Sequence, residues 1–334
     1  MIRGKRFLKT EDAGISRAQD LVYDGWDLLE RDGREARKCF EKAIELDPDL
    51  ADAYNGLAEV AVSKGNFRTA EQYYRTAYKK AKAMLRTEAK KSYFWWGELE
   101  TRPYMRARKG LGLLCLELRR YEEAIVEFKD LLYRNPNDNQ GIRYLVAPTY
   151  LLKNDVRGAL KEFDWYKRHY ASDLPDPHFL LSWALALFLA ARYREAAVRF
   201  RSTIFGNPYL IPLILGEVPE VLPIWHSNNL MYLDYAQDYL DLYGALWGGR
   251  KEAVRFLRFI WEDPDIRKDY QQWVDLWTKL NRVRGPDKRG PIIDLANRIE
   301  AKELSPTFLR KMMEFLASRG VVTPGSRSGS GLIN

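Results

Sequence analysis

The sequence is poor in the residue types on which most enzymes and secreted proteins depend. Among its 334 residues are two cysteines, Cys39 and Cys115, and three histidines, with no CxxC pair and no HExxH motif. Two separated thiols make no disulfide framework, and histidines without partners at ligand spacing predict no metal site. We therefore expect no catalytic residue, metal or cofactor; an enzyme would need a site assembled from scattered residues.

Long apolar runs are missing as well. No stretch of 18 apolar residues occurs, so no membrane-spanning segment is predicted. The first residues, MIRGKRFLKTEDAG, lack the apolar core of a secretory signal. Together with the sparse cysteines, this pattern leads us to expect a cytoplasmic protein.

What the sequence does have is a recurring spacing of small and aromatic residues. A small residue is followed four positions later by an aromatic one, which places both on one face of a helix. The pairs are Ala36 and Phe40, Ala70 and Tyr74, Ala124 and Phe128, Ala159 and Phe163, and Ala196 and Phe200. Each pair predicts the second helix of a two-helix repeat.

The first helices repeat in the same register. Their starts fall at residues 17, 51, 105, 140 and 177, with small residues at the eighth and twentieth positions. This pattern resembles the tetratricopeptide repeat, a helix–turn–helix unit of about 34 residues. The resemblance implies an all-α, right-handed helical solenoid. One interval between successive repeat starts is longer than the others, which implies an insertion at 85–104.

Three further segments resemble a narrower group. TRPYMRARKGLG, NPNDNQGIRYLV and GNPYLIPLILGE are similar to a subgroup of tetratricopeptide-repeat proteins related to the suppression-of-tumorigenicity-7-like family. The resemblance implies a scaffold and supplies no chemistry. We expect an N-terminal arm at 1–16, five repeats at 17–210, a degenerate repeat with a helical C-terminal cap at 211–320, and a disordered tail at 321–334.

The insertion contains two adjacent tryptophans, Trp95 and Trp96, in the segment FWWGELETRP. Two interpretations stay open at this stage. The tryptophans could fill the gap that an insertion opens in a solenoid, or they could form an exposed binding shelf at the edge of the groove.

Positive charge gathers around the same insertion. Between Lys79 and Gly110 there are ten basic residues and three acids, so this segment carries +7 of the net charge of +8. The acids within it are too few to pair the bases, so the cluster could attract an acidic peptide, RNA or an anionic surface. A second basic run, at 282–289, is expected to be a surface loop.

The concave groove of such a solenoid is lined by the second, fifth and ninth positions of the first helices. For repeat one the register gives Leu21 and Gly25. For the other repeats it gives Asp52, Asn55, Glu59, Arg106, Lys109, Leu113, Gly141, Tyr144, His178, Leu181 and Leu185. The predicted partner-binding residues are Asn55, Glu59, Trp95, Trp96, Arg102, Arg106, Lys109, Tyr144 and His178.

These features predict a non-catalytic scaffold that binds a protein partner. A groove with a basic middle and an apolar far end suits an extended acidic or acidic–hydrophobic segment. The alternative is an RNA-associated helical-repeat protein that uses the basic cluster at 79–110. RNA recognition favours basic and aromatic residues on successive repeats, whereas here the charge lies in one insertion. The oligomeric state stays open.

Overall fold

The computed structural model describes residues 13–85, 95–173, 176–226 and 228–321, and all the regular elements in these ranges are helices. The chain divides into two compact units, unit 1 (Met1–Lys153) and unit 2 (Asn154–Asn334). This division falls inside the array predicted at 17–210. Nearly all of the predicted tail, most of the arm and the part of the insertion at 86–94 lie outside the described residues. None of the described helices is long and apolar enough to cross a bilayer.

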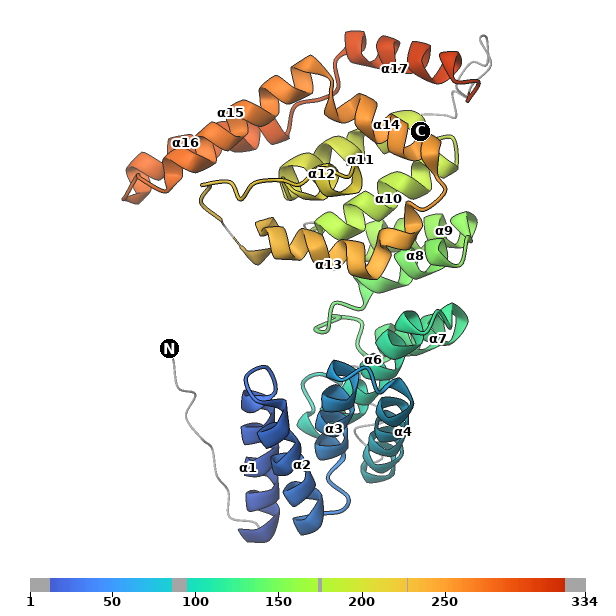
Figure 1. Ribbon diagram of the computed structural model, residues 1–334, viewed down its shortest axis with the longest axis vertical. Coiled ribbons are helices and arrows are strands. Elements are labelled where there is room, and N and C mark those ends of the chain that lie inside the picture. The colour runs from blue at the N-terminus through green and yellow to red at the C-terminus, as the bar shows by residue number, and fades with distance from the viewer. Residues whose placement is uncertain (1–12, 86–94, 174–175, 227, 322–334) are drawn as a thin grey trace. The chain divides into compact units, whose positions relative to one another are not determined.

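Unit 1 is a row of helices in which each packs against the next one described along the chain (Figure 1). Small residues bring the helices close, and the first three hairpins begin near the predicted positions. The elements are α1 (Ala13–Leu28), α2 (Gly33–Leu46), α3 (Ala51–Ser63), α4 (Phe67–Met84), η1 (Leu99–Thr101), α6 (Arg102–Glu117), α7 (Tyr121–Arg134) and α8 (Arg143–Leu152).

One aromatic side chain on the second helix of each hairpin determines how closely the neighbouring helices pack. Phe40 lies in the space where a Cβ on Gly25 or Gly56 would be, so its ring fits between α1 and α3. Tyr74 fills the equivalent space at Gly110. Close packing of this kind leaves no room for an added methyl group. The glycines on the first helices are therefore as necessary as the aromatic residues on the second.

Replacing Gly56 with alanine tests this packing. The new Cβ would come within 2.3 Å of the Phe40 ring. Overpacking outweighs the gain in helix propensity, so we expect a net destabilisation of about 1–2 kcal/mol. Gly33→Ala is the matched control, because nothing lies within 4 Å of its added Cβ. Thermal melts followed by circular dichroism should show a lower midpoint for Gly56→Ala alone; equal midpoints would contradict the packing argument.

Three of the turns inside the hairpins share one backbone conformation. Gly65, Arg119 and Ala191 each lie two residues after the end of a first helix, with φ of 69°, 57° and 59°. A left-handed conformation is easiest for glycine. Arg119 and Ala191 adopt it because packing of the two flanking helices fixes the turn.

Unit 2 begins with three helices, α9 (Val156–His169), α10 (Pro177–Leu189) and α11 (Tyr193–Gly206). Nearly every residue of α10 is buried, because later helices cover the face that α9 and α11 leave open. Those later elements are α12 (Leu210–Ile214), η2 (Asn229–Met231), α13 (Leu233–Tyr243), η3 (Gly244–Leu246), α14 (Lys251–Trp261), α15 (Pro264–Leu280), α16 (Pro286–Glu300) and α17 (Pro306–Ser318). Figure 1 shows α15 and α16 running side by side at the outer part of this unit.

One expectation for this region is wrong. Residues 282–289 do not form a plain surface loop, because α16 begins at Pro286, directly after Gly285 with φ of 88°. The Arg289 guanidinium donates to the Leu280 carbonyl at 2.9 Å and lies 4.3 Å from the centre of the Trp225 ring. Arg289 is thus part of the packing of α15 and α16, whereas Arg282, Arg284 and Lys288 of the same run are exposed.

Candidate functional site

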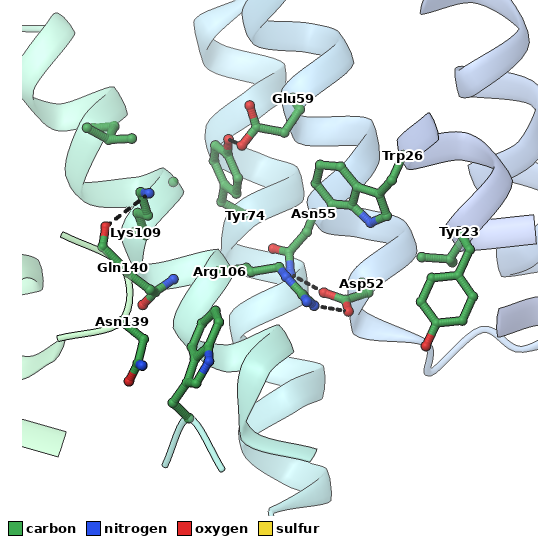
Figure 2. A pocket seen from close by; sticks show the side chains of 14 residues that line it. Tyr23, Trp26, Asp52, Asn55, Glu59, Tyr74, Arg106, Lys109, Asn139 and Gln140 are labelled. Carbon is green, nitrogen blue, oxygen red and sulfur yellow. Dashed lines mark hydrogen bonds and ion pairs between the residues drawn. The ribbon is translucent and has the colours of Figure 1, made fainter. Parts of the chain in front are cut away.

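A pocket of about 580 Å³ opens in unit 1 between α1, α3, α4, α6 and the turn after α7; we call it the α3–α6 pocket (Figure 2). Its lining combines aromatic rings with charged and amide side chains. The lining residues are Val22, Tyr23, Trp26, Asp52, Asn55, Glu59, Tyr74, Trp96, Arg106, Lys109, Gly110, Leu113, Asn139 and Gln140.

The groove positions predicted for repeats two and three meet in this pocket. Helix α3 contributes Asp52, Asn55 and Glu59, and α6 contributes Arg106, Lys109 and Leu113. Spacings of three and four residues place each set on one helix face. Geometry thus brings together four of the nine predicted binding residues (Asn55, Glu59, Arg106 and Lys109) from two successive repeats, and Trp96 joins them from the insertion.

The register predicted for repeat one is one residue too early. Val22 and Trp26 line the pocket in place of Leu21 and Gly25. Gly25 lies against Phe40 as Gly112 lies against Phe128, so Gly25 takes the eighth position of its repeat. Gly25 could have indicated the correct register, because a small residue is expected at the eighth position.

An ion pair crosses the pocket from α6 to α3. The Arg106 guanidinium bonds to the carboxylate of Asp52, which is 7% exposed. The Asn55 side-chain amide donates to the same carboxylate at 3.0 Å and to the Pro103 carbonyl at 2.9 Å. Both of its hydrogens are therefore used, which fixes the orientation of the amide. Among the described residues, the Asn55 Oδ1 has no hydrogen-bond partner.

Two other charged groups in the pocket have neutral partners. The Tyr74 hydroxyl donates to Glu59 at 2.6 Å, and burial together with the Glu59 charge raises the pKa of Tyr74. The Lys109 ammonium donates to the Gln140 carbonyl at 3.3 Å. Within the described ranges no ion pair joins Glu59 or Lys109 to an opposite charge. These two groups are thus available to a ligand.

The two tryptophans of the insertion differ in exposure. Trp95 is 2% exposed, with its ring 5.2 Å from that of Tyr104 and 4.7 Å from the Arg134 guanidinium. Neighbouring side chains enclose the Trp95 ring, so it cannot be part of an exposed binding shelf. This burial agrees with the other interpretation, in which the ring fills the gap that the insertion opens. Trp96 is half-buried and lines the pocket. Arg102 donates to the Trp96 carbonyl at 3.0 Å and stacks over its ring, so Arg102 supports the pocket wall.

The basic cluster at 79–110 is partly paired with carboxylates where the structure describes it. Arg106 pairs with Asp52, and Lys80 pairs with Asp49 at 2.9 Å. Arg108 is buried between two carboxylates, Glu127 and Asp130. Burial opposes the charge of Arg108, but the hydrogen bonds that it donates to Glu127 and Tyr104 raise its pKa overall. These acids come from outside the 79–110 segment, so a count of the acids inside it underestimates how many of its bases are paired. Arg86, Lys90 and Lys91 lie outside the described residues.

Two predicted binding residues lie elsewhere. His178, in unit 2, is 8% exposed because α13 covers it. Its Nε2 lies 2.6 Å from the Tyr235 carbonyl oxygen, its ring stacks on Tyr235, and burial lowers its pKa. The expectation that it faces an open groove is therefore wrong. Tyr144, on α8, accepts a hydrogen bond from Arg143 at 2.9 Å and does not line the α3–α6 pocket.

Comparison with known proteins identifies the repeats of unit 1. Tetratricopeptide-repeat family models match residues 30–84 and 110–138. Both matches fall on hairpins that form the pocket, and the all-α tetratricopeptide-repeat fold class predicted from the sequence is confirmed. Such repeats imply a role in protein interaction.

Similar proteins add little detail. Superkiller protein 3 from Schizosaccharomyces pombe (strain 972 / ATCC 24843) is 26% identical over 177 residues. That match takes in 49% of this chain but 12% of the relative, so the chain spans a small part of that protein's length. A solved structure described as the functional characterization of Pseudomonas aeruginosa pilF has a TM-score of 0.47 and 18% identity, over 78% of this chain and 90% of that one.

Proposed function

We propose that unit 1 is a non-catalytic scaffold that binds an extended protein segment in the α3–α6 pocket. One observation supports this more than any other. Groove positions of two successive repeats, on α3 and α6, line a single pocket together with aromatic residues of α1 and the insertion. An extended chain lying across successive first helices would contact all of these residues in turn.

The chemistry of the pocket supports a segment with both acidic and apolar side chains. Trp26, Trp96 and Leu113 offer apolar surface, and aromatic anchors of this kind dominate the energy of many interfaces. The Lys109 ammonium can gain a carboxylate partner in place of a weak contact to a carbonyl oxygen. We therefore retain an acidic–hydrophobic segment as the proposed ligand.

The RNA alternative has less support. Three of the seven basic residues of the 79–110 cluster that the structure describes are paired with carboxylates, so less charge is left for a phosphate backbone. The cytoplasmic location and the resemblance to the suppression-of-tumorigenicity-7-like subgroup remain predictions.

Blocking the pocket tests the proposal. Leu113→Arg places a long cation in the pocket, whereas Val126→Arg makes the same change at an exposed site on α7. Affinity capture from the source cells with mass spectrometry should recover about tenfold less partner with Leu113→Arg and an unchanged amount with Val126→Arg. Nuclease treatment should not alter recovery. Full recovery by Leu113→Arg would refute the pocket as the binding site, and loss on nuclease treatment would favour RNA.

A further inference from the structure

The α3–α6 pocket keeps one charge of each sign after its internal ion pair is satisfied. It contains two carboxylates, Asp52 and Glu59, and two cations, Arg106 and Lys109. Arg106 and Asp52 pair with each other. Glu59 on α3 and Lys109 on α6 remain, and Figure 2 shows them as separate groups facing the same pocket. A ligand therefore meets a negative group on one helix and a positive group on the other.

The α3 side of the pocket offers acceptors alone. Glu59 uses one carboxylate oxygen for the Tyr74 hydroxyl, at 2.6 Å. One helical turn earlier, Asn55 presents an Oδ1 that lacks a partner among the described residues, although the side chain is 1% exposed. A buried acceptor without a partner costs free energy, and a carboxylate placed near it would add another acceptor and no donor. This helix face is suited to N–H donors and disfavours carboxylates.

Trp26 strengthens the preference for a basic side chain. It projects from α1 into the same pocket, and its ring meets that of Phe40 edge-on, at 5.7 Å between centroids. Lysine and arginine pack their apolar stems and charged heads against such rings. A carboxylate and a tryptophan in one pocket therefore suit a lysine or arginine of the partner.

On the α6 side the requirement is reversed. The Lys109 ammonium has the Gln140 carbonyl as its hydrogen-bond acceptor, at 3.3 Å, and the described residues supply no carboxylate to it. An ammonium gains more from a charged acceptor than from a long bond to a carbonyl. An acidic side chain of the partner would provide one.

We propose that the α3–α6 pocket selects a mixed-charge segment, with a lysine or arginine held by Glu59 and Trp26 and an aspartate or glutamate held by Lys109. This rests on the proposed function and narrows it. A uniformly acidic segment would meet repulsion at Glu59 and bring further acceptors toward the acceptor-rich face of α3. Like-charge contacts of this kind exclude wrong partners and thereby give specificity.

Selection from a peptide library tests the proposal without a known partner. The probe is a phage-displayed library of random peptides of about twelve residues, panned on the full chain. Wild type should enrich peptides that combine a basic and an acidic residue at a fixed spacing. Glu59→Gln should lose the basic position alone, and Lys109→Gln the acidic position alone. Glu45→Gln and Lys42→Gln, two exposed sites on α2, are the matched controls and should select as wild type does.

Affinity measurements on the best enriched peptide complete the test. Fluorescence anisotropy should show binding weakened about fivefold to tenfold by either pocket variant and unchanged by either control. Enrichment of acidic peptides without a basic position would overturn the mixed-charge proposal while leaving the scaffold function standing. Peptides that bind both pocket variants as tightly as wild type would also overturn the mixed-charge proposal. A wild-type protein that enriches no peptide would overturn the scaffold function itself.

Discussion

Replacing Trp95 with alanine is expected to lower the free energy of unfolding by about 3–5 kcal/mol, the usual cost of removing a buried aromatic side chain. The ring is 2% exposed and lies between Tyr104 on α6 and Arg134 on α7. Its loss would leave a cavity where the insertion joins the stack. Urea unfolding followed by far-UV circular dichroism measures the change.

Trp96→Ala is the matched comparison, since it removes the same side chain from the next position. Trp96 is half-buried, so we expect a loss of about 1 kcal/mol or less, together with weaker binding in the α3–α6 pocket. Equal destabilisation by the two variants would show that both tryptophans are structural. A stable Trp95→Ala protein would show that Trp95 does not fill the stack.

The hairpins of unit 1 could be predicted because their signal is local. A small residue and an aromatic one four positions apart, such as Ala36 and Phe40, indicate how one helix packs on its neighbour, and both lie within one helix. Helix α16 lacks such a pair. It starts in the basic run after Gly285 and contains Pro291, and both features favour a loop, although its buried residues Ile292, Ala296 and Ile299 are spaced as on one helix face.

The sequence predicts which residues face the pocket better than it predicts which of them form ion pairs or are covered by other helices. Helical spacing alone places Asn55, Glu59 and Lys109 toward one groove. The ion pair between Asp52 and Arg106 joins residues 54 positions apart, which no local count of charge can detect. His178 looked open in its own repeat, but Tyr235, 57 positions later, covers it. Burial by distant segments decides which groove residues stay free.

The Asp52 pair leads to a second large expected effect. Reversing Arg106 to glutamate should destabilise the protein by about 2–3 kcal/mol, somewhat less than a fully buried pair would cost, because Arg106 is partly exposed. Asp52 is nearly buried and would face a second carboxylate without any cation to compensate it. Lys109→Glu should change stability by less than about 0.5 kcal/mol, since its ammonium has one long bond to a carbonyl.

A double variant separates charge repulsion from loss of packing. Asp52→Asn removes the carboxylate that the new glutamate would repel, while the amide of Asn55 can still bond to an oxygen at that position. In the Arg106→Glu background this second change should therefore restore part of the lost stability, as thermal melts can measure. If Arg106→Glu and Lys109→Glu melt alike, or if Asp52→Asn further weakens the Arg106→Glu protein, the ion pair does not stabilise the pocket. We therefore expect Lys109→Glu, unlike Arg106→Glu, to test partner capture without a large change in stability.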